Sequence, residues 1–119
     1  MPKEFGRNKR VADMMQRDLA EIIQHEQSDT GVELVTISYV DVSPDLKNAK
    51  IYFTSMDVTQ SSEEITKKLN SFAGHFRHLL SKIMTTRVVP KLKFFYDESI
   101  ERGTHLNALI DSLVKVDKG

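Results

Sequence analysis

The chain has 119 residues and no cysteine. The absence of cysteine excludes structural disulfides, thiolate zinc sites and a thiol nucleophile. There is no apolar run of about 18 residues, and the N-terminus, MPKEFGRNKR, is charged, so the sequence predicts neither a signal peptide nor a membrane span. A chain of this length can bury a core without cross-links. We therefore expect residues 1–119 to form one cytoplasmic, monomeric domain.

Acidic residues are missing from Lys67 to Lys93, a stretch that holds seven basic residues. The first ten residues add four basic side chains and one acidic side chain, and the other 82 residues hold six basic and sixteen acidic ones. The formal net charge is zero, yet such segregation creates a local positive field. One basic stretch by itself is equally typical of a solvated face. Two separate stretches favour a polyanionic partner.

The motifs of common enzyme sites are also missing. The sequence contains no GxxxxGK phosphate loop, no GxSxG elbow and no HExxH helix. His75 and His78 are spaced to share a metal, but no third ligand has a matching spacing, so solvated or phosphate-flanking histidines are favoured. Carboxylates at 97, 98 and 101 fit the start of a helix better than acid–base catalysis. We expect no metal, no cofactor and no enzymatic activity.

Hydrophobic periodicity predicts the first half of the fold. Apolar residues at helical spacing follow Asn8, which we expect to cap a helix, and Gly31 suits the C-terminal cap. Residues 32–42 alternate as a strand, with a change of phase at Tyr39–Val40 that is typical of a bulge. Residues 48–56 alternate again after a short turn. The two strands should form an antiparallel hairpin.

The second half is predicted to hold a long helix, a strand and a last helix. Ser61 and Glu64 have the spacing of a capping box, and the helix that they begin should end near Thr85 or Thr86. Residues 92–97 alternate as a third strand, and a last helix should begin near Asp97 or Ser99. This order predicts an α+β domain in which helices cover one face of a three-stranded sheet.

Gly74 interrupts the long helix, and glycine in a helix costs about 1 kcal/mol relative to alanine. It points about 150° away from the centre of the apolar face, by the rotation of 100° per residue. A glycine on the outside of a helix allows a bend, or the close approach of another backbone. We expect Gly74 to mark a kink that divides the helix and exposes backbone within a basic surface.

This kink and the two basic stretches together suggest a nucleic-acid interface. Backbone at a kink can approach a phosphodiester chain while nearby cations neutralise it, much as KH modules hold nucleic acid. The candidate RNA-binding residues are Arg7, Lys9, Arg10, Gly74, His75, Arg77, His78, Lys82 and Arg87.

Three segments resemble a known family. They are KEFGRNKRVADMMQRDLAEIIQ, VSPDLKNAKIYFT and FRHLLSKIMTTRVVPKLKFFYDESIERG, and the last contains the string R-x-V-P-x-L-x-F-x-Y-D-x-S from Arg87 to Ser99. From about residue 3 to residue 114 the chain is similar to bacterial ribosome-binding factor A. The resemblance implies a type II KH-like fold in which an Ala-x-Gly kink replaces the GxxG loop. Phe72 stands at the position of the first small residue of that kink.

The resemblance also implies a function. It is that of a cytoplasmic, non-catalytic assembly factor that binds the free 30S subunit and assists late maturation of 16S rRNA, including its 5′ end, above all in the cold. Two alternatives stay open. The domain is either a basic protein-interaction module that docks an acidic partner, or a small enzyme such as a nuclease that uses the histidine pair.

Overall fold

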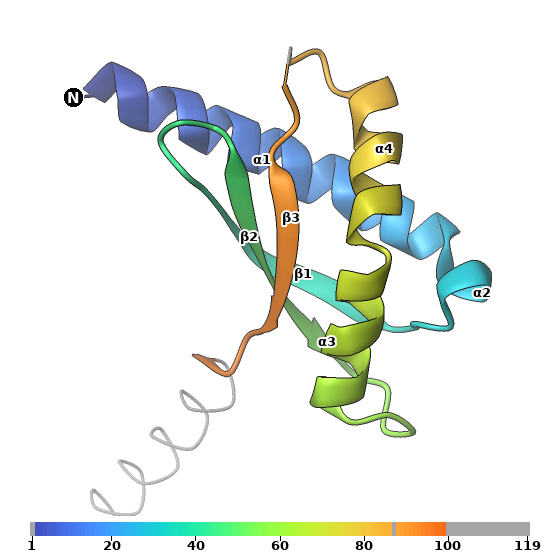
Figure 1. Ribbon diagram of the computed structural model, residues 1–119. Coiled ribbons are helices and arrows are strands. Elements are labelled where there is room, and N and C mark those ends of the chain that lie inside the picture. Colours follow the sequence, from blue (N-terminus) through green and yellow to red (C-terminus); the bar gives the residue numbers. More distant parts are fainter. Residues whose placement is uncertain (1, 87, 100–119) are drawn as a thin grey trace, which may run out of the picture.

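The centre of the fold is a three-stranded mixed sheet. The computed structural model describes residues 2–86 and 88–99, with side chains from residue 6 onward. The elements in chain order are α1 (Pro2–His25), α2 (Gln27–Thr30), β1 (Val35–Val42), β2 (Asn48–Ser55), α3 (Ser62–Ser71), α4 (Ala73–Ile83) and β3 (Lys91–Tyr96) (Figure 1). The strand order is β1-β2-β3, with β1 antiparallel and β3 parallel to β2. The predicted α+β class, hairpin and third strand are confirmed.

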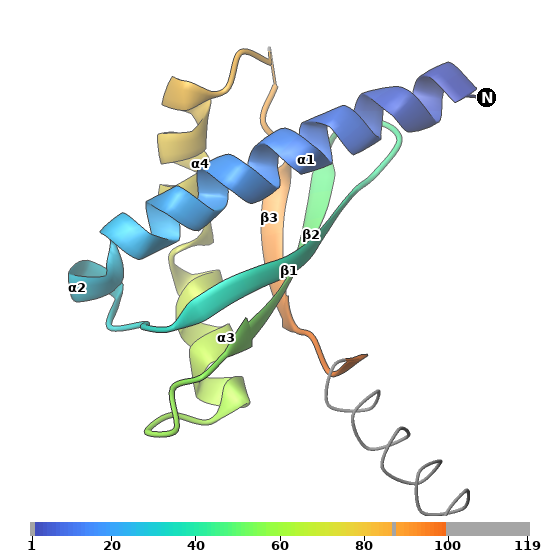
Figure 2. The same cartoon turned by 180° about the vertical axis from the view of Figure 1, so that it is seen from behind.

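The long helices pack against one face of this sheet and form a single core. In the view from behind, α1 crosses in front of the strands (Figure 2). Met15 and Leu19 lie one helical turn apart on α1, Ile51 and Phe53 alternate on β2, and all four are fully buried together with Phe76 of α4. Burying a side chain of this size contributes about 1.5–3 kcal/mol, so the core fixes how α1 and α4 sit on the sheet.

Side chains of α1 cover the outer edge of β1. The Asn8 amide Nδ2 donates to the carbonyl oxygen of Val42 at 3.0 Å, and Gln16 Nε2 donates to that of Ile37 at 3.3 Å. Such bonds occupy edge groups that would otherwise pair with another chain. The prediction that Asn8 caps the helix is wrong, because α1 begins at Pro2 and Asn8 lies inside it.

The other edge of the sheet is covered from α3. Asn70 Nδ2 donates to the Phe94 carbonyl oxygen at 3.1 Å, and Asn70 Oδ1 accepts from the Phe94 N–H at 2.7 Å. Phe94 is buried, and Leu92 and Tyr96 pack against the core. These three side chains of β3 therefore face the helices, which leaves the alternate residues of β3 on the open face.

Three local signals in the sequence have structural counterparts. Gly31 adopts the left-handed conformation, with φ 72°, and caps α2. The Ser61 hydroxyl caps α3 by accepting a hydrogen bond from the Glu64 N–H. The register shift of β1 places the extra residue at Ser38, just before the predicted Tyr39–Val40.

The long helix is interrupted as predicted, but the residue that leaves helical geometry is Phe72, two residues before the predicted Gly74. This residue has φ −100° and ψ 5°, ends α3 and precedes α4. Its side chain packs against the core, with its ring centroid 6.3 Å from that of Phe76. Gly74 lies two residues later, inside α4, and does not have a positive φ. The chain therefore turns at an aromatic residue anchored in the core.

The helix ends at Ile83, slightly before the predicted Thr85 or Thr86, and a loop of residues 84–90 leads to β3. Pro90 at the end of this loop is fully buried. Arg87 and the predicted last helix lie outside the described residues.

Candidate nucleic-acid interface

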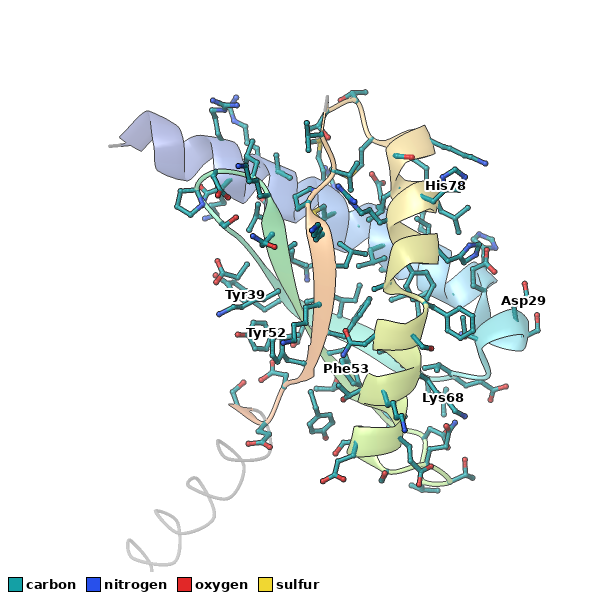
Figure 3. All side chains as sticks on the ribbon, in the orientation of Figure 1. Asp29, Tyr39, Tyr52, Phe53, Lys68 and His78 are labelled. Atoms are coloured by element: carbon teal, nitrogen blue, oxygen red, sulfur yellow. The ribbon has the colours of Figure 1, made fainter. Side chains whose placement is uncertain are left out.

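A surface hollow of about 440 Å³ lies between α4 and the loop of residues 84–90. Its described lining residues include one arginine, one histidine and no acidic residue. The lining residues are Gly74, Arg77, His78, Ser81, Thr86, Val88 and Val89. His78 is exposed and projects from α4 (Figure 3).

A second hollow, of about 530 Å³, lies between α1, the β1–β2 turn and the same loop. Its lining residues are Arg7, Arg10, Val11, Met14, Asp45, Leu46, Lys47, Thr86 and Val88. Because Thr86 and Val88 line both hollows, the two hollows adjoin at the loop. The fold thus brings together the two basic stretches, which are far apart in the sequence. We call the residues Arg7, Arg10, Lys47, Gly74, Arg77 and His78 the α1–α4 basic surface.

Arg77 holds the loop in place. Its Nε donates a hydrogen bond to the carbonyl oxygen of Val89 at 2.9 Å. Among the described residues, its two terminal nitrogens make no further hydrogen bond or ion pair. A guanidinium held by one edge presents its remaining donors in a fixed orientation, which suits a phosphate group.

Gly74 leaves the backbone of α4 open to the first hollow. A Cβ at this position would meet no heavy atom within 4 Å. The residue is exposed, and its neighbours in the hollow include Arg77 and His78. A phosphodiester backbone would approach closest where no side chain projects.

Among the residues that the structure describes, Asp45 is the one acidic residue that lines either hollow. Its carboxylate accepts hydrogen bonds from the Ser43 hydroxyl at 2.6 Å and from the Lys47 N–H at 3.0 Å. The bond from Ser43, followed by that from Lys47, lowers the pKa of Asp45 below its ordinary value. The carboxylate is therefore ionised at neutral pH and partly offsets the cations around it.

The structure places the other predicted residues away from this surface. His75 lies beside the junction of α1 and α2, with its Nε2 3.5 Å from the carboxylate of Glu26, the residue between these two helices. Lys9 lines a separate hollow between α1 and β1. Lys82 is exposed and lines neither basic hollow, and Arg87 lies outside the described residues.

Sequence reasoning missed Lys47 and the apolar loop residue Val88. Lys47 lies in a turn with an acid two residues before it, so no local charge pattern marks it. Within residues 2–86 and 88–99, no three His, Asp or Glu side chains come close enough together to hold a metal. The same part of the chain contains no helix with the length and hydrophobicity of a membrane span.

The fold and this surface define a class of protein, a small α+β domain of KH-like type with a basic surface beside a broken helix. Comparison with known families is more specific, because the family model for ribosome-binding factor A matches residues 7–110. The chain belongs to the ribosome-binding factor A family.

Close relatives cover almost the whole chain. It is 47% identical over 115 residues to ribosome-binding factor A of Nitrosococcus oceani, covering 97% of this chain and 91% of the relative. It is 50% identical over 120 residues to that of Pseudomonas syringae pv. syringae, covering 98% and 86%.

Solved structures share the fold. The crystal structure of ribosome-binding factor A from Thermus thermophilus matches with a TM-score of 0.65 at 21% identity, over 75% of this chain and 94% of that one. A homology model of the T. thermophilus factor, fitted into a cryo-EM map of its complex with the 30S subunit, matches with a TM-score of 0.61 at 21% identity, over 73% and 91%.

Proposed function

We propose that this protein binds the free 30S ribosomal subunit by contacting 16S rRNA through the α1–α4 basic surface. The observation that carries the proposal is the meeting of Arg7, Arg10 and Arg77 around one loop in a chain of zero formal net charge. A concentrated patch of this kind binds phosphates, whereas evenly distributed charges of both signs do not. The family and the Thermus thermophilus 30S complex indicate which polyanion to test.

The proposed role is a non-catalytic one in assembly. We propose that a monomer acts in the cytoplasm and assists late maturation of 16S rRNA, including processing of its 5′ end, and that this matters most in the cold. Binding without catalysis fits a surface made of cations and exposed backbone, since its described lining residues contain no nucleophile paired with a base.

The first test is co-sedimentation with separated 30S subunits, 50S subunits and joined 70S ribosomes. We expect binding to free 30S subunits alone, because an assembly factor leaves before the subunits join. Equal binding to 70S ribosomes would contradict the proposal.

The surface itself is tested by reversing two exposed charges on one helix face. The double variant Arg7→Glu/Arg10→Glu should lower 30S affinity by at least about tenfold, because two phosphate contacts become repulsions. The control, Arg17→Glu/Lys67→Glu, makes the same change of net charge at exposed residues outside both basic hollows. Equal losses in the two variants would mean that only the total charge matters.

The same variants also test the alternative that the basic surface docks an acidic protein partner. Isolated 16S rRNA fragments would then fail to bind the wild-type protein, although Arg7→Glu/Arg10→Glu still weakened binding to whole subunits. Binding of rRNA fragments with the same sensitivity to the two reversals supports contact with RNA.

A further inference from the structure

A row of three aromatic rings crosses the open face of the sheet. Tyr39 of β1 is paired with Tyr52 of β2, and Tyr52 is paired with Phe95 of β3. The ring centroids are 6.0 Å apart for Tyr39 and Tyr52 and 5.6 Å apart for Tyr52 and Phe95. Tyr39 and Tyr52 lie on the opposite side of the sheet from Phe53, which points toward α3 (Figure 3). No helix of the described residues covers these rings.

Stabilisation of the sheet accounts for only part of this row. Cross-strand aromatic pairs stabilise a sheet, and Tyr52 has such a neighbour on each side. Tyr39 stands at the end of the row with one ring neighbour among the described residues, and it is 57% exposed. An amphipathic ring so exposed on an edge strand offers a surface for stacking.

The row next to the rings carries two like charges side by side. Lys50 of β2 is directly paired with Lys93 of β3, and both are exposed. Like charges directly opposite each other destabilise a sheet. On the other side of Lys50, Asp41 of β1 is paired with it and partly offsets the repulsion between the two lysines. Lys93 Nζ lies 5.4 Å from the centroid of the Phe95 ring, so cation and ring form one surface.

We propose that this open sheet face binds unpaired RNA, with a base stacked on Tyr39 and the strand's phosphates near Lys50 and Lys93. Single-stranded nucleic acid combines flat π surfaces with a negatively charged backbone, and proteins bind it with aromatic rings beside cations. A negatively charged ligand also relieves the repulsion between the two lysines. The inference goes beyond the proposed function, because this face is separate from the α1–α4 basic surface.

The test uses a fluorescent oligouridylate of about ten nucleotides and an RNA duplex of the same length, with anisotropy measured at low salt. Tyr39→Leu should lower affinity for the single strand by at least about fivefold, the lower end of what one stacked base contributes. Affinity for the duplex should not change, because paired bases offer no free face. Tyr39→Phe keeps the ring and should bind the single strand as the wild type does.

A second measurement does not depend on variants. The ring-proton NMR signals of Tyr39 should shift upfield when the single strand is added to the wild-type protein, since a stacked base shields them. Unchanged signals, unchanged affinity of Tyr39→Leu, or an equal loss for single strand and duplex would each overturn the proposal. If the aromatic face bound a polypeptide partner instead, the ring-proton signals and the affinity of Tyr39→Leu for the single strand would both be unchanged. Sedimentation with 30S subunits is scored separately, so failure here leaves the proposed function standing.

Discussion

The helix side and the sheet side of this domain carry their cations in different surroundings. On the α1–α4 basic surface, Arg7, Arg10 and Arg77 gather around a loop, and the described lining residues include no Phe, Tyr or Trp ring. On the open sheet face, Lys50 and Lys93 stand beside a row of three rings. Cations without rings bind a phosphate backbone whether its bases are paired or unpaired, whereas aromatic rings bind only unpaired bases that are free to stack. The comparison predicts that salt weakens binding at both faces, whereas base pairing of the RNA affects binding at the open sheet face alone.

The largest expected effect is that of salt on 30S binding. If about five phosphates are neutralised, the slope of log affinity against log salt is about −4, so affinity falls about 250-fold between 50 and 200 mM salt. The measurement is a series of sedimentation assays at increasing salt.

Two variants sharpen the comparison. Arg7→Glu/Arg10→Glu should make the slope shallower by nearly two, at close to one per lost contact. Tyr39→Leu should leave the slope unchanged, because it removes a ring and no charge. If the 30S affinity of the wild type did not change with salt, the basic surface would have no part in binding.

The sequence was a good guide to features that depend on local patterning. The hairpin, the cap at Ser61 and the helix-facing side of β3 follow from period and turn chemistry, which neighbouring residues determine. The start of α1 was misplaced because Asn8, a good capping residue, instead satisfies a carbonyl of Val42, 34 residues away. Local preference does not contain that tertiary bond.

The candidate site was predicted in part for a related reason. Charge segregation identified Arg7, Arg10 and Arg77, but helical spacing alone did not separate them from Lys9 or His75. The packing of α1 against α4 and the course of the loop decide which side chains share a hollow. The pairing of Tyr39 with Tyr52 also depends on strand register. The row of rings could therefore be recognised only once the sheet was known.

A smaller effect is expected from Gly74→Ala. The backbone there is helical and a methyl group would meet nothing within 4 Å, so the free energy of unfolding should rise by up to about 1 kcal/mol. The same methyl group projects into the first basic hollow, so 30S affinity should fall several-fold. Thermal melts and sedimentation measure the two effects.

Other glycines provide matched controls for this variant. Gly6→Ala adds a methyl group at a second open helical position, outside both basic hollows, and should leave binding unchanged. Gly31→Ala should destabilise the protein, because Gly31 has φ 72°. A Gly74→Ala protein that melts earlier than the wild type would mean that the glycine is required by the fold.

The smallest effect concerns one carboxylate on each side of the molecule. Asp45 lines the second basic hollow, and hydrogen bonds from Ser43 and Lys47 lower its pKa. Asp97 is hydrogen-bonded by Ser38 and Ser99, which lower its pKa in the same way. Because Asp45 is ionised and opposes the cations, Asp45→Asn should raise 30S affinity by about twofold, the modest effect typical of an exposed charge. Asp97→Asn should leave 30S affinity unchanged.

The dependence of stability on pH checks that these carboxylates behave alike in folding. A pKa that is lower in the folded state than in the unfolded state favours folding above the ordinary value of 3.8. That contribution is lost as the pH falls through the folded-state pKa, so melting temperature should drop more steeply in acid for the wild type than for either Asn variant. Melts from about pH 6 to about pH 2 measure this. Asp45→Asn could make the melting temperature less dependent on acid pH without raising 30S affinity. Asp45 would then stabilise its turn but not affect the electrostatic potential at the second basic hollow. The difference between the two sides of the molecule would in that case depend on the arginines alone.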